Sequence, residues 1–111
     1  MSARLRRHWN WIQTFLGDSL SSRQRTHLLR RATRDQVLAV GEIVANFLHG
    51  TFDIASKDRQ KLIRYKDAYR RLAKPKGQLP WAERRTLLVK YSKPLVILLQ
   101  VLTKDLKELL Q

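Results

Sequence analysis

Apolar residues recur along this chain at intervals of three and four, which is the spacing of one face of a helix. In the first such segment, residues 2–17, a single stripe is formed by Leu5, Trp9, Ile12 and Leu16. No long window alternates apolar and polar residues as a half-buried strand would, and prolines and glycines lie between the periodic segments. The pattern predicts an all-α fold, a compact bundle of about five to six short helices.

Capping residues and glycines predict the limits of the next helices. A short second helix is expected over about residues 22–31. Thr33 and Gln36 match a capping box, in which the Thr hydroxyl accepts from the Gln amide and the Gln side chain reaches back. A third helix should follow and end at Gly50. Gly41 lies in its apolar face and costs about 1 kcal/mol relative to alanine, which predicts that another helix approaches closely there.

Three more helices are expected in the second half of the chain. Ser56 can cap a fourth that runs to about Ala73, and the prolines at positions 80 and 94 suit the first positions of a fifth and a sixth. The sixth is apolar almost all round at its start, so we expect it to be buried in the core or against a partner. Self-association or contact with a capsid protein could use its seam of Leu95, Leu98, Leu99, Leu102 and Leu106.

The distribution of charge adds cationic surfaces to this bundle. The formal net charge is +14 over 111 residues. It comes in blocks, with +7 in residues 1–34, −3 in 35–56, +10 in 57–93 and zero in 94–111. The two near-neutral blocks must supply the core, and the two basic blocks imply a polyanionic partner.

The helix expected over residues 56–73 is the most sharply amphipathic cationic element. Lys57, Arg64 and Arg71 repeat at a spacing of seven on the side opposite its apolar residues. A solvated face normally mixes both signs, but here nine cations face two anions between Lys57 and Lys76, which favours contacts with phosphates. The candidate nucleic-acid-binding residues are Lys57, Arg59, Lys61, Arg64, Lys66, Arg70, Arg71, Lys74, Lys76, Arg84 and Arg85.

The N-terminal segment is a second basic region. We expect residues 1–31 to form a basic amphipathic helix or arm and residues 32–111 to form the helical core domain. An apolar stripe beside arginines is also typical of a helix that lies on a membrane, so membrane contact through this helix is an alternative. The candidate second basic patch consists of Arg4, Arg6, Arg7, Arg30 and Arg31.

Aromatic residues are spread through the expected helices. They could stack on bases, but at helical spacing they are more simply explained as core or interface residues. They include Trp9, Trp11, Tyr65, Tyr69, Trp81 and Tyr91.

The sequence carries no pattern for catalysis or metal binding. It has no cysteine, which excludes disulfides, thiolate metal sites and thiol nucleophiles. His8, His27 and His49 are scattered, and the four glycines are too far apart for a phosphate-binding loop. A helix-turn-helix ending in residues 34–49 is rejected, because that helix is acidic and apolar and unsuited to a DNA groove. We therefore expect a non-enzymatic protein without metal or cofactor.

No segment predicts a membrane span or a secretory signal. A bilayer takes roughly 20 apolar residues to span, and the longest apolar run here, residues 95–99, is far shorter. The arginine-rich N-terminus lacks the compact apolar stretch and cleavage site of a secretory signal. We therefore expect an intracellular protein, in the nucleus or in a virion, that is not secreted.

Five segments and a closing apolar run occur in a recognisable order. They are residues 35–38 (DQVL), 42–48 (EIVANFL), 61–66 (KLIRYK), 70–73 (RRLA), 84–88 (RRTLL) and 95–102. This order resembles a family of small basic proteins of Polinton/Maverick elements and adintoviruses, some of which have been compared with the X/mu core peptide of adenoviruses. The resemblance implies a viral or transposon setting and a role in genome packaging. Residues 91–94 (YSKP) depart from it, because family tails are usually glycine-rich there.

These observations lead to a principal hypothesis and two alternatives. The first is largely sequence-independent binding of DNA through phosphate contacts, because the basic surface consists of interchangeable cations rather than side chains suited to base edges. The alternatives are a helical structural or assembly protein of a virus-like particle, and a membrane-active amphipathic protein. The choice between DNA and RNA, and the oligomeric state, stay open.

Overall fold

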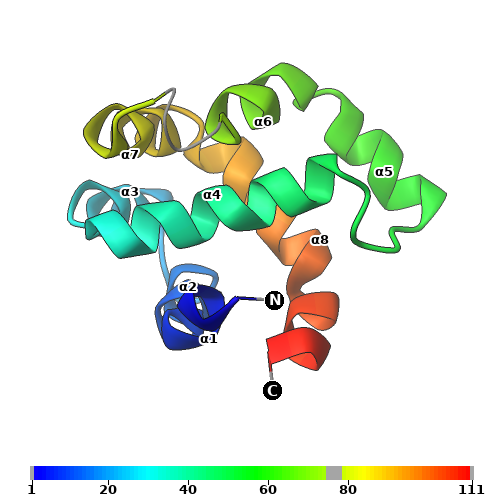
Figure 1. Ribbon diagram of the computed structural model, residues 1–111, viewed down its shortest axis with the longest axis horizontal. Helices are drawn as coiled ribbons and strands as arrows, with labels where there is room; N and C mark the ends of the chain where they lie inside the picture. Colours follow the sequence, from blue (N-terminus) through cyan, green and yellow to red (C-terminus); the bar gives the residue numbers. More distant parts are fainter. Residues whose placement is uncertain (1, 75–78, 111) are drawn as a thin grey trace.

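The computed structural model describes residues 2–74 and 79–110, which fold into helices joined by short connections (Figure 1). No strand occurs among these residues, so the all-α fold is confirmed. The structure has eight helices rather than five to six, because the expected first and fourth helices are each interrupted. The helices are α1 (Ala3–Arg7), α2 (Trp9–Phe15), α3 (Ser22–Arg30), α4 (Arg34–Leu48), α5 (Ser56–Ile63), α6 (Lys66–Leu72), α7 (Trp81–Lys90) and α8 (Ser92–Leu110).

Both interruptions occur at residues that carry no local breaking signal. His8 separates α1 from α2, and Arg64 with Tyr65 separates α5 from α6; none of them is glycine or proline. Tertiary packing gives the physical reason for the second break. Helix α5 packs on α8, whereas α6 packs on α4 and α7 as well as α8, so the two halves bury their apolar sides against different neighbours.

Helices α4 and α8 supply about half of the buried apolar residues of the core. In Figure 1, α4 crosses the middle of the molecule and α8 passes behind it. Helix α4 packs against α1, α6 and α7, and α8 packs against α3, α5, α6 and α7. The two near-neutral blocks of sequence therefore form only part of the core, because helices of both basic blocks also bury apolar side chains in it. Their fully buried side chains include Val37, Val40, Ile43, Val44, Leu95, Leu98, Leu99, Leu102 and Leu106.

Local signals placed the ends of several helices correctly. The Thr33–Gln36 capping box is present, with the Gln36 amide 3.2 Å from Thr33 Oγ1 and the Thr33 amide 2.9 Å from Gln36 Oε1. Gly50 follows α4 with a φ of 76°, which is why glycine ends the helix there.

Ser56 is not a cap, because the residue before α5 is Ala55 and no side chain caps the helix. Helix α8 begins at Ser92, two residues before Pro94, as a proline in the first turn allows.

The N-terminal helices are packed on the rest of the molecule. Leu5 of α1, and Trp9, Ile12 and Phe15 of α2, are buried in the same core as the residues of α4 and α8. The apolar stripe expected to contact a membrane is therefore occupied inside the fold. Within the described residues no single helix is long and apolar enough to cross a bilayer, and α7 and α8 meet that test only as a pair bent by 86°.

The apolar seam of α8 is likewise internal. Its five leucines at positions 95, 98, 99, 102 and 106 are all fully buried within this chain. The expectation that they contact a second copy or a capsid protein is corrected on this ground, because such a contact would require the core to open.

Candidate nucleic-acid interface

Eight of the predicted binding residues lie exposed on α5, α6 and the residues that flank them. We call this surface the α5–α6 face, and it consists of Lys57, Arg59, Lys61, Arg64, Lys66, Arg70, Arg71 and Lys74. The other sides of the two helices hold this face in place, because Leu62 of α5 and Ala68, Tyr69 and Leu72 of α6 are buried. An apolar side anchored in the core thus directs the cations outward.

Little of the charge on the α5–α6 face is neutralised by the protein itself. Only two acidic residues, Asp58 and Asp67, belong to the same helices. Among the described residues, Arg70 is the one cation of this face near a carboxylate, at 3.9 Å from Asp67. Arg71 donates to the Tyr91 hydroxyl at 2.9 Å, a neutral partner that leaves its charge in place. The face is therefore open to an external anion.

The cations do not form one continuous row. A single helix would have aligned Lys57, Arg64 and Arg71 at a spacing of seven. The break after Ile63 places Lys57 on α5 and Arg71 on α6, with Arg64 at the junction. The structure thus presents two short cationic helix surfaces that meet at Arg64, as the bend between α5 and α6 in Figure 1 shows.

Arg84 is the main correction to the predicted site. It is only 3% exposed, and its guanidinium donates to the carbonyl oxygens of Leu72 and Lys74. These carbonyls lie at the end of α6, where helix geometry leaves acceptors without partners. Burial lowers the pKa of Arg84, but an arginine stays charged at neutral pH. The side chain therefore caps a helix and does not reach a phosphate.

Gly41 provides the space that Arg84 needs. A Cβ at position 41 would lie 3.2 Å from Arg84 Nη1 and 3.7 Å from the Leu72 carbonyl oxygen. The close approach predicted from a glycine inside an apolar helix face is confirmed. The neighbours are the arginine side chain of α7 and the backbone at the end of α6.

Arg85 is directed toward the connection between α3 and α4. It is half-buried, its guanidinium lies 5.0 Å from the centre of the Trp81 ring, and Nη1 is 3.5 Å from the Ala32 carbonyl oxygen. Adjacent arginines on α7 thus have different surroundings. The remaining predicted residue, Lys76, lies outside the described residues.

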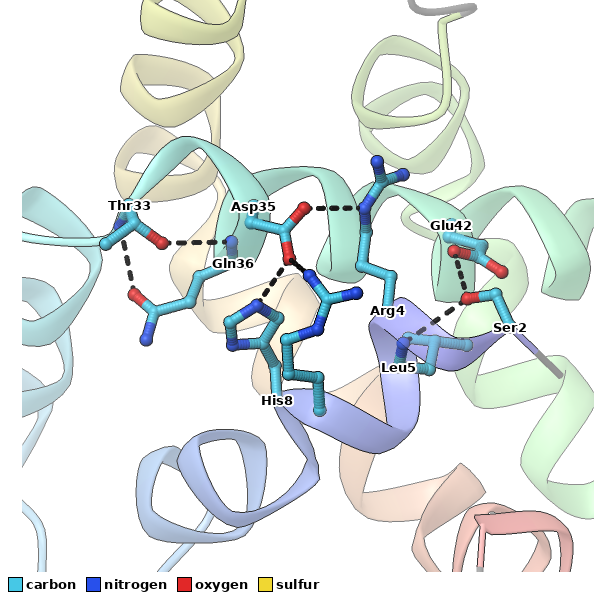
Figure 2. Close-up of polar contacts among 9 residues, drawn as sticks. Ser2, Arg4, Leu5, His8, Thr33, Asp35, Gln36 and Glu42 are labelled. Atoms are coloured by element: carbon cyan, nitrogen blue, oxygen red, sulfur yellow. Dashed lines mark hydrogen bonds and ion pairs between the residues drawn. The ribbon is translucent and has the colours of Figure 1, made fainter.

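The N-terminal basic patch is organised around one carboxylate (Figure 2). Asp35, in the first turn of α4, accepts from Arg4 Nε at 2.8 Å and from Arg7 Nη1 at 2.9 Å, and His8 Nε2 lies 2.6 Å away. We call these four residues the Asp35 cluster. The hydrogen bond with His8, followed by that from Arg4 and the charges of Arg4 and Arg7, holds the pKa of Asp35 below its ordinary value.

The other members of that patch remain exposed. Arg6 lies on α1, Arg30 ends α3, and Arg31 follows it. Asp35 was not predicted as an organising residue. The available signal was an acidic residue in the first turn of a capped helix, which indicates a helix-dipole role rather than contacts with a helix thirty residues away.

The structure removes several aromatic residues from consideration as base-stacking groups. Tyr69 is fully buried and its hydroxyl donates to the Pro94 carbonyl oxygen at 2.8 Å. Burial raises the pKa of that phenol. Trp9 is buried as well, whereas Trp81 is 37% exposed and lies beside Arg85. Most of the aromatic residues therefore serve the core.

Comparison with known proteins adds no family to these observations. No family model, no curated protein and no solved structure matches the chain. Among the described residues, no group of three or more His, Cys, Asp or Glu side chains could hold a metal ion. The geometry of the α5–α6 face is therefore the evidence from which a function must be argued.

Proposed function

We propose that this chain binds nucleic acid, with duplex DNA favoured, through phosphate contacts made by the α5–α6 face. One observation supports the proposal most strongly: eight exposed cations share a surface with two carboxylates, and among the residues that the structure describes only the Arg70–Asp67 pair is within 4 Å. Uncompensated positive charge of this density lowers the stability of the free protein, and binding to a polyanion reverses that effect.

The contacts are expected to carry little sequence information. Lys and Arg side chains on an open helical face reach phosphates, whereas base readout needs a few side chains held against base edges. Helices α5 and α6 together carry a single amide side chain, Gln60, and it is exposed. The function is therefore non-enzymatic and fits a protein that organises or packages a genome in the nucleus or in a virion.

A salt series tests the proposal directly. About six phosphate contacts give a slope near −5 when the logarithm of the binding constant is plotted against that of salt concentration. We expect the R64A/R70A/R71A variant to lower this slope by about 3. Parallel titrations with duplex DNA, duplex RNA and single strands identify the preferred ligand. A flat slope, or unchanged binding by the variant, contradicts the proposal.

A further inference from the structure

An open hollow lies between the end of α4, the connection that follows it, and helices α5 and α6. Its volume is about 350 Å³. Its walls are mostly apolar, and the apolar part comes from Phe47, Leu48, Phe52, Ile54, Leu62 and Tyr69. The connection turns at Gly50, where the positive φ lets the chain leave α4 and fold back over the end of the core. The hollow is thus built by the fold and does not depend on one mobile side chain.

The rim of the hollow combines an exposed apolar residue with two cations. Ile63 is 59% exposed, the largest fraction for any large apolar side chain among the described residues. Arg59 and Lys66 also line the hollow, and within the described residues neither lies within 4 Å of a carboxylate. An apolar cavity with unpaired cations at its edge fits an occupant that is apolar at its tip and anionic beside it.

The walls favour an apolar side chain over a nucleobase. A base that enters the hollow would bury donors and acceptors, which costs free energy unless each finds a partner. The side chains that line the hollow are hydrocarbon apart from Tyr69, whose hydroxyl already donates to the Pro94 carbonyl oxygen, and the two cations at the rim, Arg59 and Lys66, which offer no acceptor to a base. A leucine or phenylalanine side chain of a partner would give up no hydrogen bonds to water on entering the hollow. Acidic residues next to it would lie close to Arg59 and Lys66.

We propose that this hollow binds a large apolar side chain from an acidic segment of a partner protein. Such segments commonly dock as a helix with apolar anchors one turn apart. This activity goes beyond nucleic-acid binding and does not rest on it. Because Arg59 and Lys66 belong to the α5–α6 face, the acidic segment and a phosphate backbone would compete for the same cations.

Two synthetic peptides test the proposal on the full chain. One carries Leu and Phe a helical turn apart among Asp and Glu residues, and the other has Ser at both apolar positions and the same charge. We expect the first to bind at least about tenfold more tightly, since moving large apolar side chains from water into the hollow is favourable. Equal affinities would show that charge alone binds the peptide, and would overturn the proposal.

Matched variants separate the hollow from the cationic face. I63S should weaken the apolar peptide about tenfold and leave its affinity for duplex DNA unchanged, because it removes hydrocarbon and no charge. K57A should weaken binding to duplex DNA and leave the affinity for the apolar peptide unchanged, since Lys57 is exposed on α5 and does not line the hollow. R59A/K66A should weaken both ligands.

Three results would overturn the assignment of the hollow. Unchanged peptide binding by both I63S and R59A/K66A is one, and an equal loss of peptide and DNA binding by I63S is another. In the third, I63S weakens a single-stranded oligonucleotide more than the peptide, which assigns the hollow to a base. Failure of the salt series, by contrast, bears on the proposed nucleic-acid function alone.

Discussion

The two basic regions look alike in sequence and differ in the structure. In the Asp35 cluster, two arginines and a histidine converge on one carboxylate within 2.9 Å. On the α5–α6 face, the closest ion pair of the described residues is 3.9 Å long. In the first region Arg4 and Arg7 attach α1 to α4 through Asp35, whereas the cations of the α5–α6 face are left to solvent. A count of cations along the chain therefore does not measure the charge available to a ligand.

Two further arginines, outside the Asp35 cluster and the α5–α6 face, bind carbonyl oxygens at helix ends. Arg25 donates to the carbonyl oxygens of Phe15, the last residue of α2, and of Gly17, two residues later, each at 2.9 Å. Arg84 donates in the same way to the carbonyls of Leu72 and Lys74 at the end of α6. Each arginine comes from a later helix and supplies donors at a helix end, where helix geometry leaves carbonyls without partners. The chain thus uses arginine to hold helix ends as well as to present charge.

The largest expected effect comes from removing equal charge from the two regions. K61Q/R64Q should lower affinity for duplex DNA about fiftyfold and the salt slope by about 2, because about two phosphate contacts are lost. R4Q/R7Q should lower the affinity less than about threefold, since Asp35 already compensates these arginines. Filter binding across a salt series measures both, with K104Q/K107Q on α8 as the control for net charge. Equal losses in the two regions would refute the comparison.

Next in size is the effect of removing the arginine cap of α6. R84M should lower the free energy of unfolding by about 2 kcal/mol, because it leaves the Leu72 and Lys74 carbonyls without their donor. The change should leave the salt slope of DNA binding intact. Urea denaturation and the salt series measure the two quantities, and R85M serves as the matched control on α7. If R84M lowered the salt slope of DNA binding and left the free energy of unfolding unchanged, Arg84 would be a phosphate-binding residue and not a helix cap.

A smaller effect is expected when the carboxylate of the Asp35 cluster is removed. D35N should lower the midpoint of thermal unfolding, because Arg4 and Arg7 then repel one another without compensation. The same change should raise affinity for duplex DNA about threefold, since the freed cations become available to phosphates. Calorimetry and DNA titration follow the two changes. A fall in affinity at temperatures where D35N is folded would contradict this account of the cluster.

The smallest expected effect is the pH dependence of that cluster. Because His8 and Arg4 hold the pKa of Asp35 below its ordinary value of 3.8, the ionised carboxylate stabilises the folded state. This stabilisation is complete above pH 3.8 and is lost as the pH falls through the folded-state pKa. The difference in urea midpoint between the natural chain and D35N should therefore shrink in acid. A difference that stays constant down to about pH 2 would contradict this sign.

Local patterns in the sequence predicted much of the fold. The apolar periodicity placed α3, α4 and α8 closely, and the capping box and Gly50 set both ends of α4. The breaks at His8 and Arg64–Tyr65 were not predicted, because no proline or glycine marks them; at the second break, α6 packs on α4 and α7 in addition to α8, on which α5 packs. Propensity describes one segment at a time, whereas a break of this kind depends on two packing surfaces.

The sequence likewise predicted one part of the candidate site and missed another. The exposed cations of α5 and α6 could be identified because the spacing of apolar residues in an amphipathic helix predicts which side faces water. The burial of Arg84 could not, since its neighbour Arg85 has the same side chain and α7 has a weak apolar pattern. The cavity at the end of α4 was also invisible, because its walls come from four separate segments.

The sequence by itself determined that this protein is all helical, that two neutral segments contribute to its core and that its surface is strongly cationic. Those properties follow from composition and from periodicity within single helices. Only the tertiary structure decided which cations are free, which are paired on Asp35 and which cap a helix end. The physical reason is that a charge is available or compensated according to what lies within about 4 Å of it. For Arg4, Arg7 and Arg84, those neighbours come from residues far away along the chain.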